Sequence, residues 1–372
     1  MLPAPSRPTA WRLALGVSLC ALTLLVVAVR AAGQAQTTSV FASRIEQFSE
    51  PSGYFDTDNL MSNERSYLHP LEMLRQRGTS GGVYIGVGPD QNFSYIANLH
   101  PAMAFIVDIR RDNMLLHLLF KALFALSRDR AEYLSVLFGR PPPRASDDWR
   151  RASVRRLVQY VDSVQPDPAR VTSIRRRVDS EILRFGVPLS RTDRETIERF
   201  HRTFVDGGLS LKFQSTGRPP REYYPSYREL LLETDRNGHE GSYLASEDLF
   251  QFVKSMQARD LVIPVVGNIA GTRALAAIGR FMAERGERLS VFYASNVELY
   301  LSQDRMFPRF IGNLEKLPYD EGSVIIRSIF GRTTAESVPG YDSTSVVQSL
   351  AQLVAGYQSG KFPTYESLIY PR

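Results

Sequence analysis

The residues best suited to chemistry lie in a glycine turn and at the end of the strand expected after it. In "VYIGVGPDQN" an uncharged apolar run leads into Gly86 and Gly88, and in "AFIVDI" a second apolar run leads to Asp108. A glycine turn before a helix leaves backbone N–H groups available to an anion or a polar cofactor edge. An acidic residue ending the next strand can accept hydrogen bonds from ribose hydroxyls, and Asp108 lies 20 residues after Gly88. The pattern indicates a nucleotide-like cofactor.

This turn departs from the G-x-G-x-x-G pattern of dinucleotide-binding proteins. Gln91 stands where the third glycine would allow close helix–strand contact, so an NAD-type oxidoreductase is the weaker alternative. Asp90 and Asn92 add polar side chains to the turn and are counted as candidate cofactor-binding residues. An acidic side chain there would repel a pyrophosphate and would suit a cationic ligand such as a sulfonium or an amine.

The same stretches resemble the class I S-adenosylmethionine-dependent methyltransferases, in which a glycine-rich turn follows the first strand and an acidic residue ends the second. The resemblance implies that Gly86 and Gly88 line an S-adenosylmethionine site and that Asp108 binds the ribose hydroxyls. "LVIPVVGNIAG" looks like the fourth strand of that family, which would place Asn268 at the reaction centre as a candidate catalytic and cofactor-binding residue. The chain also resembles members of an uncharacterised bacterial family, to which no activity can be attached.

A further candidate lies at the end of another expected strand, in "YASNVELYL". Asn296, with Ser295 and Glu298, would share the sheet edge that carries Asn268 and Asp108, where converging polar groups can line a pocket. The alternative is that these residues begin a helix, with Ser295 or Asn296 as its N-cap.

His239 is the other candidate catalytic residue, because it could act with Glu240 as a general acid–base pair. The alternative is a solvated side chain in the polar turn from Asp235 to Gly241. The sequence holds no G-x-S-x-G, P-loop or H-E-x-x-H motif and no histidine cluster, so no metal site is predicted.

Apolar runs alternate with helical segments of 12 to 15 residues over much of the chain. This alternation predicts an α/β fold, with a Rossmann-like, doubly wound, mostly parallel sheet whose last strand is "SVIIRSIF". The predicted segments are residues 1–36, a signal peptide or N-terminal membrane anchor; 37–80, helices and loops; 81–139, the first half of the Rossmann-like domain; 140–202, an arginine-rich helical insertion; and 203–372, the second half.

The insertion concentrates the charge of the protein. Residues 140–202 hold 15 arginines, no lysine and 9 acidic residues, which equals the whole net charge of +6. An amphipathic, solvated cover for the sheet is the preferred interpretation, and contact with an anionic membrane surface is the alternative. Nucleic acid is an unlikely partner because acidic residues are interleaved and no recognised DNA-binding motif is present.

The N-terminus reads as a targeting segment. Arg7 and Arg12 precede an apolar run of 17 residues, Leu13–Val29. A cleaved signal peptide and an uncleaved anchor are both consistent with it, so the protein is predicted to be membrane-associated or exported, on an undetermined side of the membrane. Cys20, the only cysteine, lies in this segment, which excludes thiol chemistry and cysteine metal ligands from the rest of the chain.

The leading hypothesis is therefore a methyltransferase-like domain that binds an S-adenosyl cofactor, with an unknown substrate and with methyl transfer either retained or lost. The alternative is a non-catalytic, envelope-associated protein that binds a small molecule or a partner. The leader favours this alternative, because S-adenosylmethionine is a cytoplasmic metabolite.

Overall fold

The centre of the structure is a sheet whose strands run mostly in one direction. The computed structural model describes residues 39–144, 148–217, 219 and 221–370. In this part of the chain six strands form one sheet, in the order β3-β2-β1-β4-β5-β6. Neighbours from β3 to β5 pair in parallel, whereas β6 pairs antiparallel with β5. The strands are β1 (Val83–Gly86), β2 (Met103–Asp108), β3 (Val262–Val266), β4 (Leu289–Ser295), β5 (Tyr319–Phe330) and β6 (Ser343–Ser349).

The central strands are apolar because both faces of the sheet are covered. Every residue of β1 and β3 is buried, and neither strand alternates between apolar and polar side chains. Such runs are typical of parallel strands between two helical layers. Pro264 has no N–H group to donate to a neighbouring strand. It is tolerated inside β3 because β3 is an edge strand that pairs with β2 on one side only.

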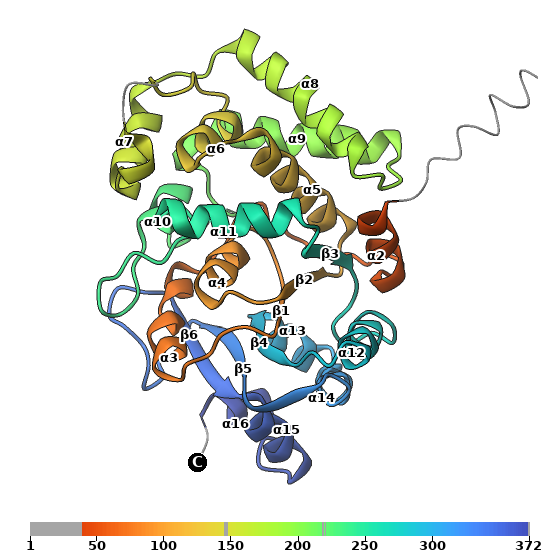
Figure 1. Cartoon of the computed structure of the whole chain (residues 1–372). Coiled ribbons are helices and arrows are strands. Elements are labelled where there is room, and N and C mark those ends of the chain that lie inside the picture. Colours follow the sequence, from red (N-terminus) through yellow and green to blue (C-terminus); the bar gives the residue numbers. More distant parts are fainter. Residues whose placement is uncertain (1–38, 145–147, 218, 220, 371–372) are drawn as a thin grey trace, which may run out of the picture. The chain divides into compact units, whose positions relative to one another are not determined.

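Helices cover the sheet on both sides, as Figure 1 shows. On one side α5 packs against β2 and β3, and α11 packs against α4 and α5. On the other side α15 packs against β5 and β6, and α14 packs against α12 and α15. The predicted Rossmann-like, doubly wound α/β fold is thereby confirmed. The covering helices are α4 (Gln91–Leu99), α5 (Arg111–Leu126), α11 (Glu247–Ala258), α12 (Ala274–Glu284), α14 (Phe307–Leu314) and α15 (Leu350–Gln358).

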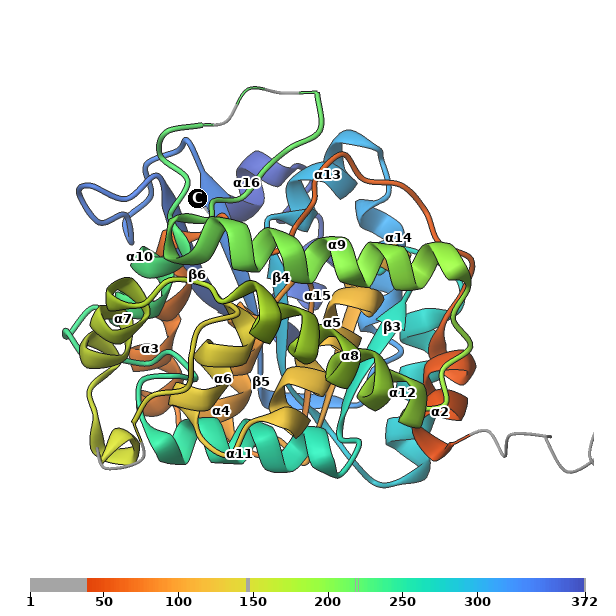
Figure 2. The same ribbon diagram turned by 90° about the horizontal axis from the view of Figure 1, so that it is seen from above.

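The arginine-rich segment forms a further helical layer outside α5 and α6 (Arg130–Leu137), visible in Figure 2. It contains α7 (Val154–Ser163), α8 (Pro168–Arg184) and α9 (Arg191–Gly207). Helices α8 and α9 pack on α5, and α7 packs on α6. Ser190 begins α9 with a capping box that it forms with Asp193, which fixes where the last of these helices starts.

One strand was missing from the sequence prediction. The structure continues past the predicted last strand to β6, which is rich in serine and threonine. The serine and threonine residues of β6 are buried, and two of their hydroxyls meet Ser66, whose Oγ lies 2.9 Å from Ser343 Oγ and 3.0 Å from Ser345 Oγ. The remaining elements are α2 (Val40–Phe48), η1 (Arg65–Leu68), α3 (Pro70–Gln76), η2 (Trp149–Arg151), η3 (Gly208–Ser210), α10 (Tyr227–Leu232), α13 (Val297–Gln303) and α16 (Tyr365–Ile369).

All of these elements belong to the unit Val40–Arg372. Within the described residues, no helix is long and apolar enough to cross a membrane. The apolar run Leu13–Val29, on which the prediction of a signal peptide or an anchor rests, lies outside the described residues.

Candidate functional site

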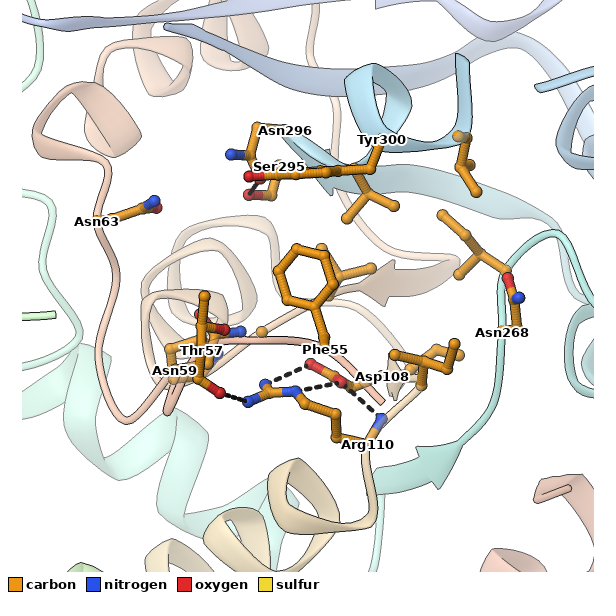
Figure 3. A pocket seen from close by; sticks show the side chains of 18 of the residues that line it. Phe55, Thr57, Asn59, Asn63, Asp108, Arg110, Asn268, Ser295, Asn296 and Tyr300 are labelled. Carbon is orange, nitrogen blue, oxygen red and sulfur yellow. Dashed lines mark hydrogen bonds and ion pairs between the residues drawn. The ribbon is translucent and has the colours of Figure 1, made fainter. Parts of the chain in front are cut away.

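A large pocket opens at the carboxyl ends of the four strands β1 to β4. It encloses about 1170 Å³, including its open mouth, and Gly88, Asp108, Asn268 and Asn296 all line it. These four residues follow β1, β2, β3 and β4 respectively, or end them. From β1 the strands follow one another outward to β2 and β3, and from β4 they follow one another in the opposite direction to β5 and β6. The order therefore reverses between β1 and β4, and ligands of doubly wound folds bind at such a switch point. We call this cavity the strand-end pocket (Figure 3).

The glycine turn is fixed by hydrogen bonds from the side chain of Asn92, which is itself bonded to Tyr84. Gly88 has φ +85°, a conformation that a residue with a side chain adopts only with strain. The Asn92 Nδ2 group donates to the carbonyls of Val87 at 2.9 Å and of Pro89 at 2.7 Å, and Tyr84 donates to its Oδ1 at 2.8 Å. Asn92 therefore shapes the turn and does not line the pocket.

Gly86 and His117 also serve this turn. A Cβ on Gly86 would lie 2.0 Å from Asn92 Oδ1, so the glycine is needed for packing beneath the turn. Gly86 is not among the residues that line the pocket. His117 Nε2 lies 2.9 Å from the Gly88 carbonyl oxygen, and burial lowers the pKa of His117 to about 4. The neutral ring thus donates its Nε2 proton to the turn.

Asp90, a candidate from the sequence, is not among the residues that line the strand-end pocket. Its carboxylate accepts hydrogen bonds from Tyr227 at 2.6 Å and from Tyr243 at 3.2 Å. Burial raises the pKa of Asp90 to about 6. Asp90 stands at the N-cap of α4 and contributes no atom to the lining of the strand-end pocket.

At the end of β2, Asp108 lines the pocket but is already bonded to Arg110. Asp108 Oδ1 accepts from the backbone N–H of Arg110 at 2.9 Å and from its Nε at 3.1 Å, and Oδ2 accepts from Nη2 at 3.1 Å. Arg110 Nη1 donates to the carbonyls of Thr57 at 2.6 Å and Asp58 at 3.2 Å. Both side chains are about nine-tenths buried, so the pair, which we call the β2 pair, is a neutral and rigid part of the wall.

The two asparagines lie at the ends of β3 and β4, on the pocket wall (Figure 3). Asn268 Oδ1 accepts from the backbone N–H of Ala270 at 2.9 Å, which closes a short turn after β3. Asn296 Oδ1 lies 3.4 Å from Ser295 Oγ. In the described part of the chain no acceptor bonds to the Nδ2 group of either residue, so both amides can donate to a ligand.

Sequence reasoning missed Glu64 as a site residue. Its carboxylate is completely buried and accepts from Tyr293 at 2.5 Å, from Ser328 at 2.5 Å and from Ser295. No described lysine, arginine or histidine pairs with it, and burial raises the pKa of Glu64. Ser295 lines the pocket and has φ +53°, an unusual value for a residue with a side chain. We call Glu64 the β4 carboxylate because it bonds to Tyr293 and Ser295 of β4. Glu64 itself lies in a loop, so no periodic sequence signal marks it.

The rest of the wall offers aromatic surface and two unsatisfied polar atoms. The rings of Phe55 and Tyr300 lie 4.9 Å apart at 90°, and Phe213 and Tyr224 add a second edge-to-face pair on the wall. Thr57 Oγ1 and Gln91 Oε1 are buried and have no hydrogen-bond partner among the described residues. Both residues line the pocket, and buried polar atoms of this kind are normally satisfied by a ligand or by water. 

The structure does not bring His239 to this site. Its side chain is 67% exposed, lies 3.3 Å from Asp235 through Nδ1, and does not line the pocket. Potential ligand atoms of Glu72, Asp235 and His239 lie within 4.8 Å of one another. Arg75 occupies this cluster, because its guanidinium bonds to both Glu72 and Asp235.

Comparison of the sequence with models of known protein families identifies the family of the chain. A family described as a domain of unknown function, DUF7790, matches residues 60–141 and 198–364, which is more than half of the chain. The chain belongs to the DUF7790 family. No curated protein matches it. The DUF7790 match contains all four strand ends of the pocket and also Glu64.

The DUF7790 match is interrupted at residues 142–197, which include α7, α8 and the start of α9. Several arginines of the arginine-rich segment, residues 140–202, have acidic partners, which reduces the positive charge available to a membrane surface. Its ion pairs include Arg175–Glu198 at 3.5 Å, Arg184–Glu181 at 2.7 Å, Arg191–Glu195 at 2.7 Å and Arg202–Glu198 at 2.8 Å.

Proposed function

We propose that the protein is a methyltransferase-like domain that binds an S-adenosyl cofactor in the strand-end pocket. One observation carries the proposal: Gly88, just after β1, and Asp108, at the end of the adjacent β2, line the same pocket, which lies at the switch point of the sheet. A nucleoside needs this combination, because the glycine turn lets the ligand approach the backbone and the carboxylate accepts from ribose hydroxyls.

The residues present fit such a ligand. Thr57 Oγ1 and Gln91 Oε1 are buried acceptors on the pocket wall without a protein donor, and the amides of Asn268 and Asn296 supply donors. Asp108 Oδ2 accepts one hydrogen bond within the protein and has capacity for another. The aromatic side chains of the wall would exclude water from an adenine ring.

When bound, S-adenosylmethionine supplies an electrophilic methyl group. The chain itself would hold and orient the cofactor from β1 and β2 and would leave the Asn268 side of the pocket to the methyl acceptor. Positioning of two reactants in this way is the main contribution that a protein makes to a group transfer of this kind. 

The alternative is a non-catalytic protein that binds a small molecule in the same pocket, and the β2 pair favours it. Arg110 occupies three of the acceptor sites of Asp108, so a ribose gains less there than from a free carboxylate. An NAD-type dinucleotide is less suitable, because the side chain of Gln91 occupies the position where the fingerprint has its third glycine.

Thermal unfolding of the full-length chain with S-adenosylmethionine, S-adenosylhomocysteine or NAD⁺ tests the proposal. A ligand at about 100 times its Kd adds about 2.7 kcal/mol to the free energy of unfolding, which raises Tm by several degrees. We expect both S-adenosyl compounds to raise Tm and Asp108→Asn to reduce that shift. Asp342→Asn, which changes an exposed aspartate, is the matched control. No shift with either S-adenosyl compound would leave the binding-protein alternative.

A further inference from the structure

We infer that Glu64 gives the strand-end pocket a preference for a positively charged ligand, so that the S-adenosyl cofactor is recognised in its sulfonium form. This inference rests on the proposed function and adds to it the charge that the site selects. It assigns a role to a buried carboxylate that lies outside the glycine turn and outside the strands.

The charges around the pocket single out this carboxylate. Asp108 is neutralised by Arg110, and Asp90 faces away from the pocket into a group of tyrosines. Asp304 lines the mouth but is exposed, so water and salt screen its field. Glu64 does not itself line the pocket, but it lies directly behind Ser295 of the wall and has only hydroxyl partners among the described residues. Its field is therefore neither cancelled by a cation nor screened by solvent.

Ser295 connects Glu64 to the pocket. Its hydroxyl donates to Glu64 and its side chain lines the cavity, so one residue separates the carboxylate from a ligand. The left-handed backbone of Ser295 holds it in this place, and strain of this kind is often found at functional sites.

The strand order brings the charged part of the cofactor to this side. Asp108 ends β2, β1 is the next strand, and β4 with Ser295 lies beyond β1. Neighbouring strands lie about 4.8 Å apart, so the two strand ends are separated by roughly 10 Å. A ligand whose ribose lies at β2 extends across β1 toward β4, which places the sulfonium closer to Glu64 than the ribose is. 

The groups packed against Glu64 leave it as the titrating group. Tyr293 on β4, Tyr84 on β1 and Tyr95 on α4 face it, and burial raises the pKa of each of these tyrosines well above its ordinary value, so they stay neutral. Ser328 on β5 is neutral, and it bonds onward to Ser345 on β6 at 3.1 Å. Because burial raises the pKa of Glu64, its charge develops as pH rises beyond the ordinary range of a glutamate.

The affinities of S-adenosylmethionine and S-adenosylhomocysteine for the full-length chain test this inference. The two compounds share the adenosine and the amino acid group and differ in the sulfonium, so other ionisations largely cancel in the ratio of their Kd values. Calorimetric titration over the whole pH range in which the chain stays folded should show the ratio moving toward S-adenosylmethionine by about tenfold as pH rises. This is the order expected for unit charges roughly 10 Å apart at an effective dielectric constant of about 20.

Glu64→Gln should remove this pH dependence and leave S-adenosylhomocysteine binding nearly unchanged. Glu233→Gln is the control, because Glu233 is also buried but lies outside the pocket and bonds to Arg65. Ser295→Ala should alter both affinities by a similar factor, because it removes a hydroxyl and keeps the charge.

The outcomes separate the two proposals. Failure of both compounds to bind the wild-type chain would overturn the proposed function. Binding of both with a ratio that stays constant with pH, or that Glu64→Gln does not change, would overturn the present inference alone. If Glu64→Gln does not fold, the pH dependence of the wild-type ratio still decides.

Discussion

The two sides of the pocket solve the burial of a carboxylate differently. At the end of β2, Asp108 is paired with the guanidinium of Arg110, which also bonds to two backbone carbonyls. Beside the end of β4, Glu64 from the loop before η1 has three hydroxyl donors and no cation among its described partners. The first arrangement removes charge from the pocket wall, whereas the second keeps it.

The bonding partners of a buried acid near a strand end, and not its position alone, therefore decide its role. The β2 pair fixes the shape of the wall, and its charge is cancelled over about 3 Å. The β4 carboxylate is oriented by neutral donors, so its charge depends on pH and acts on whatever occupies the pocket. Substitutions that change each carboxylate, its partner or its exposure therefore have different expected effects.

The largest effect is expected when the β2 pair is broken. Arg110→Met leaves a buried carboxylate without its cation and two carbonyls without a donor, and breaking a buried pair costs about 3–5 kcal/mol of unfolding free energy. Urea unfolding of the full-length chain measures this loss. The double variant Arg110→Met with Asp108→Asn removes both charges and should recover part of the loss. A loss below about 1 kcal/mol in the single variant would show that the pair does not rigidify the wall.

Asp90 is a third buried carboxylate, and like Glu64 it accepts hydrogen bonds from hydroxyl groups and not from a cation. Burial raises the pKa of Asp90 to about 6 in the folded protein, against 3.8 for an ordinary aspartate. Between these values the folded state binds more protons than the unfolded state, so stability falls as pH rises through this window. Asp90→Asn should remove this slope and raise the stability at pH 7 by about 1–3 kcal/mol.

Urea unfolding at several pH values between about 4 and 7, which spans the two pKa values, measures that slope. Asp342→Asn, at an exposed position, is the control and should leave the slope unchanged. A slope that Asp90→Asn does not alter would mean that the tyrosines stabilise the charged form enough to cancel the effect of burial.

Much of the fold could be predicted from the sequence. Continuous apolar runs such as "VYIGV" and "MAFIVDI" indicate buried parallel strands, and their alternation with helices gives the doubly wound order. The edge strand β6 could not be predicted in this way, because it is composed largely of hydroxyl residues whose partners, such as Ser66, lie far away in the chain. The burial of β6 depends on contacts between residues far apart in the chain, and such contacts leave no periodic pattern of apolar residues in the sequence.

The candidate site was predictable only where strand ends determine position. Gly88, Asp108, Asn268 and Asn296 line the pocket because each follows or ends a parallel strand. Asp90 could not be placed, since the direction of a side chain within a turn depends on which partners receive it, here Tyr227 and Tyr243 from distant segments. Long-range contacts of the same kind explain why Glu64 carried no signal.

A smaller loss of stability is expected for a substitution in the glycine turn, which follows β1 between β2 and β4. Gly88→Ala places a side chain at φ +85°, with its Cβ 3.0 Å from Gln91 Nε2, and should cost about 1 kcal/mol of stability. It should also weaken binding of both S-adenosyl compounds, because the backbone there can no longer approach a ligand. Gly340→Ala is a matched control: its φ is also +85°, nothing lies within 4 Å, and it does not line the pocket.

Thermal unfolding and calorimetric titration separate the two effects. Equal stability losses with weakened binding only in Gly88→Ala support a ligand-contacting turn. Equal losses with equal binding would assign the turn to folding alone.

The smallest effect is expected where the same ion pair is exposed. Arg191 and Glu195 in α9 form an arginine–carboxylate pair at 2.7 Å, closer than Arg110 and Asp108 at 3.1 Å, but their side chains are 88% and 56% exposed. Water solvates both groups when the pair is broken, so Arg191→Met should change the free energy of unfolding by about 0.5 kcal/mol or less. Measured beside Arg110→Met by urea unfolding, it isolates burial as the variable. Similar losses in both variants would mean that contact distance, and not exclusion of water, sets the strength of the β2 pair.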